Sequence, residues 1–121
     1  MILVDTNAWI GHLRQRDPRL VSFLLSQRVH TCDIVIGELL LGSGLPSGFG
    51  DDLLRLPRLP SPGANETRLF IERHRGSFAG SGIGWADSQI ILAAKKTGAQ
   101  IHTLDRGVRK VSALVGVRIA R

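Results

Sequence analysis

Short apolar runs alternate along this chain with longer segments in which apolar residues recur at helical spacing. The short runs predict buried strands, and the longer segments predict helices bounded by capping residues, proline and glycine. Strands are predicted at 2–4, 29–32, 100–103 and 115–119, with a short edge strand around Leu59. Helices are predicted at 7–13, 17–27, 34–41, 51–56, 65–75, 86–96 and 107–114.

This order of elements predicts the fold class. Strands and helices that alternate with short connections form a parallel sheet covered by helices on both faces, so an α/β architecture is expected. The stretch 42–63 is rich in glycine and proline and is expected to be mostly loop, as is the stretch 76–84. No internal repeat is visible, and residues 1–121 are expected to form a single domain.

Composition narrows the class of protein. No run approaches the ~20 apolar residues that a membrane-spanning helix needs. The N-terminus opens directly into a strand without a basic and apolar leader, and Cys32 is the sole cysteine. A cytoplasmic protein without disulfides is therefore expected.

The charge is strongly positive, with 16 Lys and Arg against 10 Asp and Glu and a formal net charge of +6. A basic surface suits a polyanionic partner such as nucleic acid. An excess of arginine also keeps a protein soluble, and charge alone does not decide between these two interpretations.

Four acids lie in or beside the apolar runs: Asp5, Glu38, Asp87 and Asp105. A buried carboxylate without a partner is costly, so four placed this way indicate that they gather around a cation. Asp5 and Asp105 follow strands, Asp87 opens a helix and Glu38 lies in the helix after the second strand. A parallel sheet would bring all four to one edge, where ligands bind in such folds.

Each acid also has a structural interpretation. Asp5 can cap the following helix, although Asn7 is an equally good cap. Asp87 in a first turn favours the helix dipole, and Asp105 suits a turn before Gly107. Glu38 has apolar neighbours on its helix, and an arginine partner is its main alternative. The coincidence of the four, rather than any one of them, supports a hard divalent metal and phosphate chemistry.

With these residues in place, the chain resembles the PIN-domain nucleases, and more narrowly the VapC-type toxins of toxin–antitoxin pairs. Size and order match over essentially the whole chain. Each motif alone is weak, but four in order at these intervals form a strong signal. The matching segments are residues 2–10 (ILVDTNAWI), 36–42 (IGELLLG), 82–93 (GIGWADSQIILA) and 103–106 (TLDR).

The resemblance implies a three-layer α/β/α sandwich with a central, mainly parallel sheet of four to five strands. It implies an acidic pocket that binds Mg²⁺ or Mn²⁺ for endoribonuclease chemistry, with single-stranded or loop RNA as the expected substrate. A VapB-like antitoxin and a second copy of the chain are the expected partners. The family's acids carry over to Asp5, Glu38, Asp87 and Asp105. The neighbouring polar positions fall on Thr6, expected to support the first acid, and on Asn7, expected to keep a cap and polar contact.

Further residues are candidates for contacts with RNA or with a partner. Arg14, Arg75, Lys95 and Arg106 are expected near the rim of the pocket, where they could contact phosphate; their alternative is a solvated surface. A groove around 9–13 could hold an antitoxin helix, although Trp9 and Leu13 are expected in the core. Two alternatives to a toxin stay open: a PIN nuclease for housekeeping RNA processing, and a non-catalytic nucleic-acid-binding module.

Overall fold

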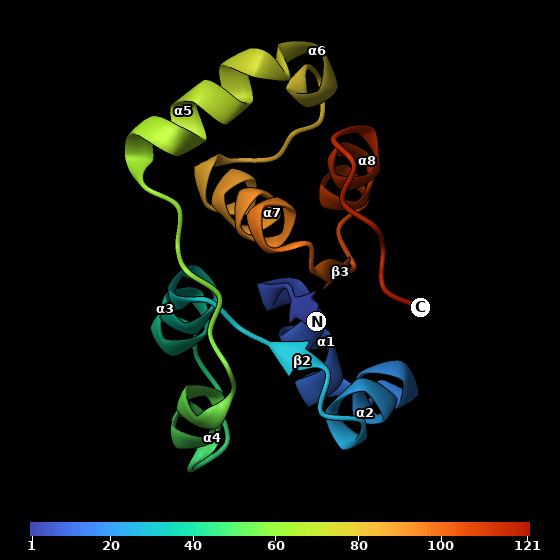
Figure 1. Cartoon of the computed structure of the whole chain (residues 1–121). Helices are drawn as coiled ribbons and strands as arrows, with labels where there is room; N and C mark the ends of the chain where they lie inside the picture. Colours follow the sequence, from blue (N-terminus) through green and yellow to red (C-terminus); the bar gives the residue numbers. More distant parts are fainter.

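The computed structural model describes all 121 residues, and a small parallel sheet forms its centre (Figure 1). Strand β1 (Ile2–Val4) lies between β2 (Val29–His30) and β3 (Gln100–His102), and both pairings are parallel. Leu3 is in register with His30 and with Ile101, and Val4 with His102. The carboxyl ends of the three strands therefore lie at one edge of the sheet.

The predicted parallel sheet between helices is confirmed, but it has three strands rather than four or five. The two other expected strands are present only as single bridges, Thr31 with Arg58 and Ile101 with Ile119. Pro57 and Pro60 flank the first bridge and lack the N–H groups that a longer ladder would need. Before the second, Gly116 takes a positive φ of 88°, which turns the chain and leaves room for one bridge.

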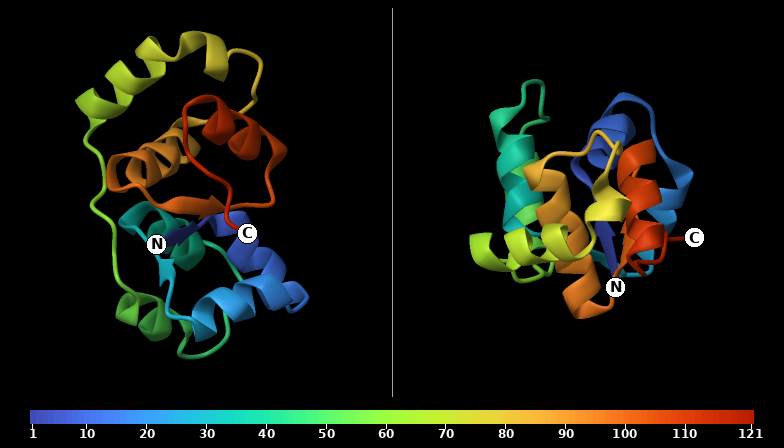
Figure 2. Two further views of the ribbon diagram at one scale, coloured as in Figure 1. Left: turned by 45° about the vertical axis from the view of Figure 1, so that its right-hand side comes forward. Right: turned by 90° about the horizontal axis from the view of Figure 1, so that it is seen from above.

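Eight helices surround the sheet, and Figures 1 and 2 show α7 and α8 on one side of it and α1 and α2 on the other. None of these helices combines the length and apolar character that crossing a bilayer requires. The bounds are α1 (Thr6–Arg14), α2 (Pro18–Leu25), α3 (Asp33–Leu41), α4 (Phe49–Arg55), α5 (Ala64–Arg73), α6 (Arg75–Phe78), α7 (Trp85–Thr97) and α8 (Arg106–Leu114).

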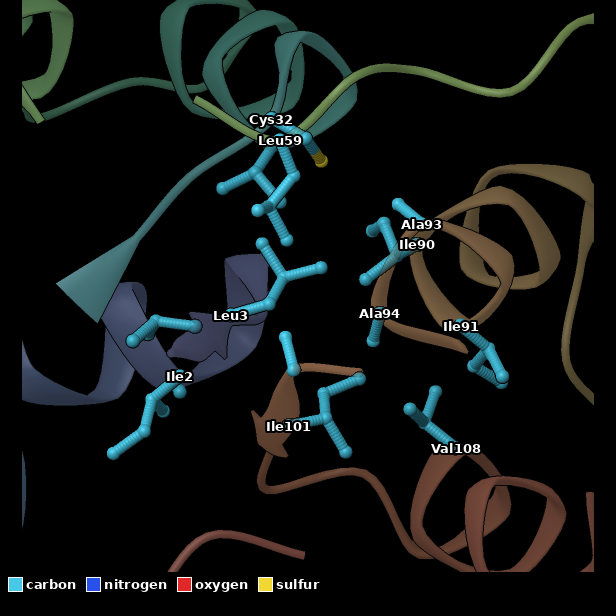
Figure 3. Packing of buried hydrophobic residues seen from close by; sticks show 14 of the residues in the cluster. Ile2, Leu3, Cys32, Leu59, Ile90, Ile91, Ala93, Ala94, Ile101 and Val108 are labelled. Carbon is cyan, nitrogen blue, oxygen red and sulfur yellow. The ribbon is translucent and has the colours of Figure 1, made fainter. Parts of the chain in front are cut away.

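The main core lies between the sheet and helix α7. Figure 3 shows Ile90 and Ala94 of α7 pointing toward Leu3 of β1 and Ile101 of β3. These four side chains are fully buried. Apolar residues at spacings of three and four place one face of α7 on the sheet, which fixes the start of α7 beside the carboxyl edge of the strands.

The helix boundaries match the sequence pattern except between 65 and 84. The expected helix over 65–75 ends at Arg73, and a separate short helix, α6, occupies part of the expected loop over 76–84. His74 lies between the two helices with φ of −113° and ψ of 31°, outside the helical region.

Candidate active site

Asp5 lies at the carboxyl end of β1 and is buried, with 2% of its surface exposed. Its Oδ1 accepts a hydrogen bond from the Thr6 N–H at 2.8 Å, which makes Asp5 the N-cap of α1. Its Oδ2 accepts hydrogen bonds from Thr103 Oγ1 at 2.8 Å and from Asn7 Nδ2 at 3.3 Å. The residue therefore combines the capping role with a carboxylate oriented by three donors.

Asn7 has a different place from the one expected. It is not the helix cap, because α1 already begins at Thr6 and is capped by Asp5. Asn7 Nδ2 donates to Asp5 and its Oδ1 accepts the Leu104 N–H at 2.9 Å. The side chain thus joins the end of β1 to the segment that follows β3.

Glu38 was expected to be buried, and this expectation is wrong. Its side chain is exposed, near the end of α3, and its Oε1 accepts a hydrogen bond from Thr6 Oγ1 at 2.6 Å. Helix α3 is apolar nearly all the way round, and it exposes Leu40 and Leu41 as well. Glu38 therefore stands at the open side of the site, beside Asp5, without being enclosed by the core.

Asp87 and Asp105 complete the set of acids. Asp87 is half-buried in the first turn of α7, and its Oδ2 accepts the Gly84 N–H at 3.5 Å. Asp105 is exposed and is the N-cap of α8, with its Oδ1 accepting the Val108 N–H at 2.9 Å. Of the four acids expected to be withdrawn from solvent, only Asp5 is fully buried.

The electrostatics show that these carboxylates share one environment. Burial raises the pKa of Asp5 from 3.8 to about 6; the Thr103 and Thr6 hydrogen bonds oppose the rise, and the charges of Asp87 and Glu38 add to it. Burial also raises the pKa of Asp87, and the charges of Asp105 and Glu38 contribute. Asp5 and Asp105 follow the carboxyl ends of β1 and β3, Asp87 lies in the first turn of α7, and Thr6 donates a hydrogen bond to Glu38, so the fold brings the four acids to one edge of the sheet.

None of the four acids has a basic partner within 4 Å. The ion pairs of the molecule use five other acids: Asp17, Asp33, Asp52, Glu66 and Glu72. Of the ten acids, this leaves the four site residues and Asp51 without a cation. Carboxylate oxygens without cationic partners are the donors that Mg²⁺ and Mn²⁺ prefer, so the chemistry of this set fits such an ion.

The geometry is looser than a closed ligand set. No three His, Cys, Asp or Glu side chains lie close enough together, as they stand, to hold a metal ion. The prediction that all four acids are metal ligands therefore stays a prediction. Two of the carboxylates are also engaged as helix caps, which holds them at their present positions.

Two of the four basic candidates, Arg14 and Arg106, lie beside one of the four acids. Arg14 lines a cleft of about 380 Å³ together with Glu38, Ile10 and Leu13, and Arg106 directly follows Asp105 at the start of α8. Arg75 is exposed at the start of α6. Lys95 is not brought to the rim: it lies two turns along α7 from Asp87, and its Nζ donates to the Val115 carbonyl.

Thr103 was missed as a separate residue by the sequence reasoning, although it lies within a matching segment. It is fully buried, donates to Asp5 and accepts the Asp105 N–H at 3.1 Å, so it connects two of the four acids. Val4 and His102 are paired in register, so the next residues, Asp5 and Thr103, emerge side by side. The sequence did contain a signal for this role: a residue with a hydroxyl group directly follows a buried strand and stands two residues before an acid.

Comparison with known proteins agrees with this arrangement. Residues 2–114 match the family model of the PIN domain. The chain is 36% identical to ribonuclease VapC32 of Mycobacterium tuberculosis over 122 aligned residues, which cover 99% of this chain and 97% of that protein.

Solved structures show the same fold. FitAcB from Neisseria gonorrhoeae has a TM-score of 0.65 and 26% identity, over 100% of this chain and 97% of that one. The DNA-bound VapBC from Salmonella typhimurium has a TM-score of 0.69 and 21% identity, over 98% of this chain and 96% of that one. From the matched family model and the VapC32 relative together, we conclude that this chain belongs to the PIN-domain family.

Proposed function

We propose that this protein is a metal-dependent endoribonuclease that hydrolyses single-stranded or loop RNA and is the toxin of a toxin–antitoxin pair. The observation that carries the proposal is the group of four carboxylates without basic partners at the carboxyl edge of the sheet. The identity of 36% with a ribonuclease over nearly the whole chain supports the reaction and the class of substrate.

In this proposal Asp5, Asp87 and Asp105, with Glu38, would hold Mg²⁺ or Mn²⁺. When bound, such an ion supplies an activated water and neutralises charge that builds on the scissile phosphate. Burial is the main cause of the raised pKa of Asp5, and the charges of Asp87 and Glu38 add to it, so the negative charge at this site is unfavourable without a cation. The same arrangement therefore favours binding of a divalent cation.

The surrounding residues position the carboxylates. Thr103 and the Thr6 N–H each donate to a different oxygen of Asp5, which fixes its plane. The Thr6 hydroxyl donates to Glu38 and leaves its second oxygen free. Exposed to solvent, that oxygen can accept a proton from a water molecule or serve as a ligand. Thr6 and Thr103 thus hold the acids for in-line attack of water on a phosphodiester.

A protein partner is part of the proposal. Two of the solved structures with this fold, one of FitAB and one of VapBC, are bound to DNA. In the present chain the cleft that contains Glu38 and Arg14 is continuous with apolar residues of α1 and α3, and Leu41 beside it is 90% exposed. An amphipathic antitoxin segment in this cleft would cover Glu38 and so block the reaction. The same proposal includes a homodimer, as expected from the family.

The test is cleavage of cellular RNA by the purified chain in Mg²⁺ or Mn²⁺, with EDTA as the metal-free reference. Discrete cuts are expected only with metal, and Asp5→Asn and Asp87→Asn are expected to reduce the rate by at least about a hundredfold. Asp51→Asn is the matched control, because Asp51 is also an unpaired acid but lies in α4, outside the site.

Three outcomes would redirect the proposal. Near-normal cleavage by Asp5→Asn would remove Asp5 from the reaction. RNA binding without metal-dependent cleavage would favour a non-catalytic binding module. If no DNA-binding protein encoded by a neighbouring gene inhibits cleavage when it is co-expressed, a nuclease for housekeeping RNA processing is favoured.

A further inference from the structure

A second cleft borders the segment between Thr103 and Asp105, because Leu104 is one of its lining residues. It has a volume of about 430 Å³, and its lining comes from the end of α1, the start of α2, β3 and the first half of α8. The basic cleft, as we call it, is lined by His12, Arg16, Arg19, His102 and Arg109. Its one acid is Asp17.

The charge of the basic cleft is neutralised only in part from within, by Asp17. Asp17 is already engaged: its Oδ2 contacts His102 Nε2 at 2.9 Å and its Oδ1 accepts the Arg19 N–H at 2.9 Å. Arg16, Arg19 and Arg109 have no carboxylate within 4 Å. Arg55, Arg58 and Arg68 pair with acids and the other ten arginines do not, so the basic cleft is distinguished by its place beside the four acids. Three arginines thus line one cleft, and none of their guanidinium groups has a carboxylate within 4 Å.

The basic cleft is joined directly to the site of the four acids. Arg109 Nη2 donates to the Thr103 carbonyl at 3.1 Å, and the hydroxyl of the same Thr103 donates to Asp5. Leu104 lines the cleft, while its N–H is held by Asn7. A Cβ at Gly11 would lie 2.7 Å from Leu104 Cδ1, so the glycine lets this segment lie against α1. One strand of nucleic acid crossing Leu104 would meet both sites.

We propose that the basic cleft binds backbone phosphates of the RNA strand that is cut at the four acids, an inference that rests on the proposed function. Guanidinium groups match phosphate oxygens with paired hydrogen bonds, and an arginine without a carboxylate partner can bind phosphate without first breaking an ion pair. Contacts of this kind read no bases. The basic cleft therefore supplies affinity and sets where the strand lies, without selecting the sequence that is cleaved.

The experiment compares two double variants that remove the same charge. Arg16→Gln with Arg19→Gln alters the basic cleft. Arg118→Gln with Arg121→Gln is the matched control, because these residues line a different cleft, with Arg28 and Gln100, at the amino ends of the strands. Arg109 is left unchanged because it also holds Thr103. All four substituted side chains are exposed, so unfolding temperatures should stay the same.

Two measurements are made on a single-stranded RNA oligonucleotide. For cleavage in Mg²⁺, the Arg16/Arg19 variant should raise KM about tenfold with kcat unchanged, since uniform binding is lost. For binding in EDTA, followed by fluorescence anisotropy, the slope of log K against log salt should become shallower by about 1.4, from about 0.7 for each phosphate contact. The Arg118/Arg121 control should change neither quantity.

The outcomes separate the two proposals. If the wild type cleaves RNA and both double variants change KM and the salt slope equally, the basic cleft has no special role and only the inference fails. If the wild type binds RNA without cleaving it and only the Arg16/Arg19 variant loses salt dependence, the basic cleft stands and the proposed nuclease function fails. If the wild type neither cleaves nor binds, both fail.

Discussion

Asp5 has two roles that usually belong to different residues. As the N-cap of α1 it must accept a backbone hydrogen bond, and as a buried acid it must tolerate the loss of water around its charge. The hydrogen bonds from Thr103 and Thr6 offset part of the loss, and no cation offsets the rest. At neutral pH this one side chain therefore opposes folding unless a cation is bound.

This leads to a prediction about stability in EDTA. Because the pKa of Asp5 is about 6 in the folded chain against an ordinary 3.8, the folded chain binds the proton more tightly than the unfolded chain does. The stability that protonation of Asp5 contributes is complete below about pH 4 and is lost as the pH rises through 6. By urea unfolding, Asp5→Asn should gain stability over wild type between pH 4 and 7, by on the order of 3 kcal/mol.

Thr103 provides the internal check on that prediction. Thr103→Val removes the hydroxyl that lowers the pKa of Asp5, so the pH window in which stability is lost should move to higher pH. Thr103→Ser keeps the hydroxyl and should leave the window in place. A stability difference between Asp5→Asn and wild type that stays constant from pH 4 to 7 would show that Asp5 does not titrate there.

Single residues also show where sequence reasoning reached its limit. The place of Asp5 followed from its position at the end of an apolar strand. The exposure of Glu38 could not be predicted, because an apolar pattern all round α3 does not tell which face is inward. The contact between Thr103 and Asp5 joins residues 98 positions apart and depends on strand register, which local patterns do not specify.

At the scale of elements, the loop between α6 and α7 packs closely on the start of α8. A Cβ at Gly107 would lie 2.6 Å from the Ser81 carbonyl oxygen and 2.9 Å from Ile83 Cγ2. Gly82 in the same loop has a φ of 74°, in the left-handed region. The loop leads directly into α7 and Asp87, so Gly107 keeps Asp87 and Asp105 at their present separation.

Gly107→Ala is therefore expected to be destabilising. The added methyl group must displace the backbone at Ser81, at a cost of about 1–3 kcal/mol, and cleavage should fall because Asp87 moves with the loop. Gly76→Ala is the control, since a Cβ there meets nothing within 4 Å and Gly76 lies in a helix. Thermal unfolding of both variants decides the matter; equal unfolding temperatures would mean that the loop yields without cost.

Most elements could be predicted because capping and periodicity act locally. Proline, glycine and acids at helix starts placed the bounds of the helices within a few residues. The failures are the elements that depend on distant partners. Whether 115–119 forms a strand depends on how much of β3 is open beside it, and only Ile119 finds a bridge.

At the scale of the whole molecule, the end of the chain belongs to the core. Val117 and Ala120 are buried, and Ile101 of β3 exchanges backbone hydrogen bonds with Arg118 and Ala120. The matched family region ends at 114, before these residues. The segment 117–120 therefore protects the outer edge of β3, whose other edge holds β1 and Asp5.

Removing residues 117–121 is expected to destabilise the fold by about 3 kcal/mol or more, from lost apolar burial and two lost hydrogen bonds. Removing Arg121 alone should have little effect, because it is exposed and makes no ion pair. Urea unfolding of the two shortened chains tests this. Equal stabilities would show that β3 is held by β1 and α7 without the end of the chain.

The contact between Asp5 and Thr103 has a consequence during synthesis. The first carboxylate leaves the ribosome early, but the hydroxyl that orients it and the strand beside it arrive 98 residues later. A nascent chain therefore lacks an assembled site for most of its translation. Under the proposed function, cleavage of RNA cannot begin before nearly the whole chain has left the ribosome.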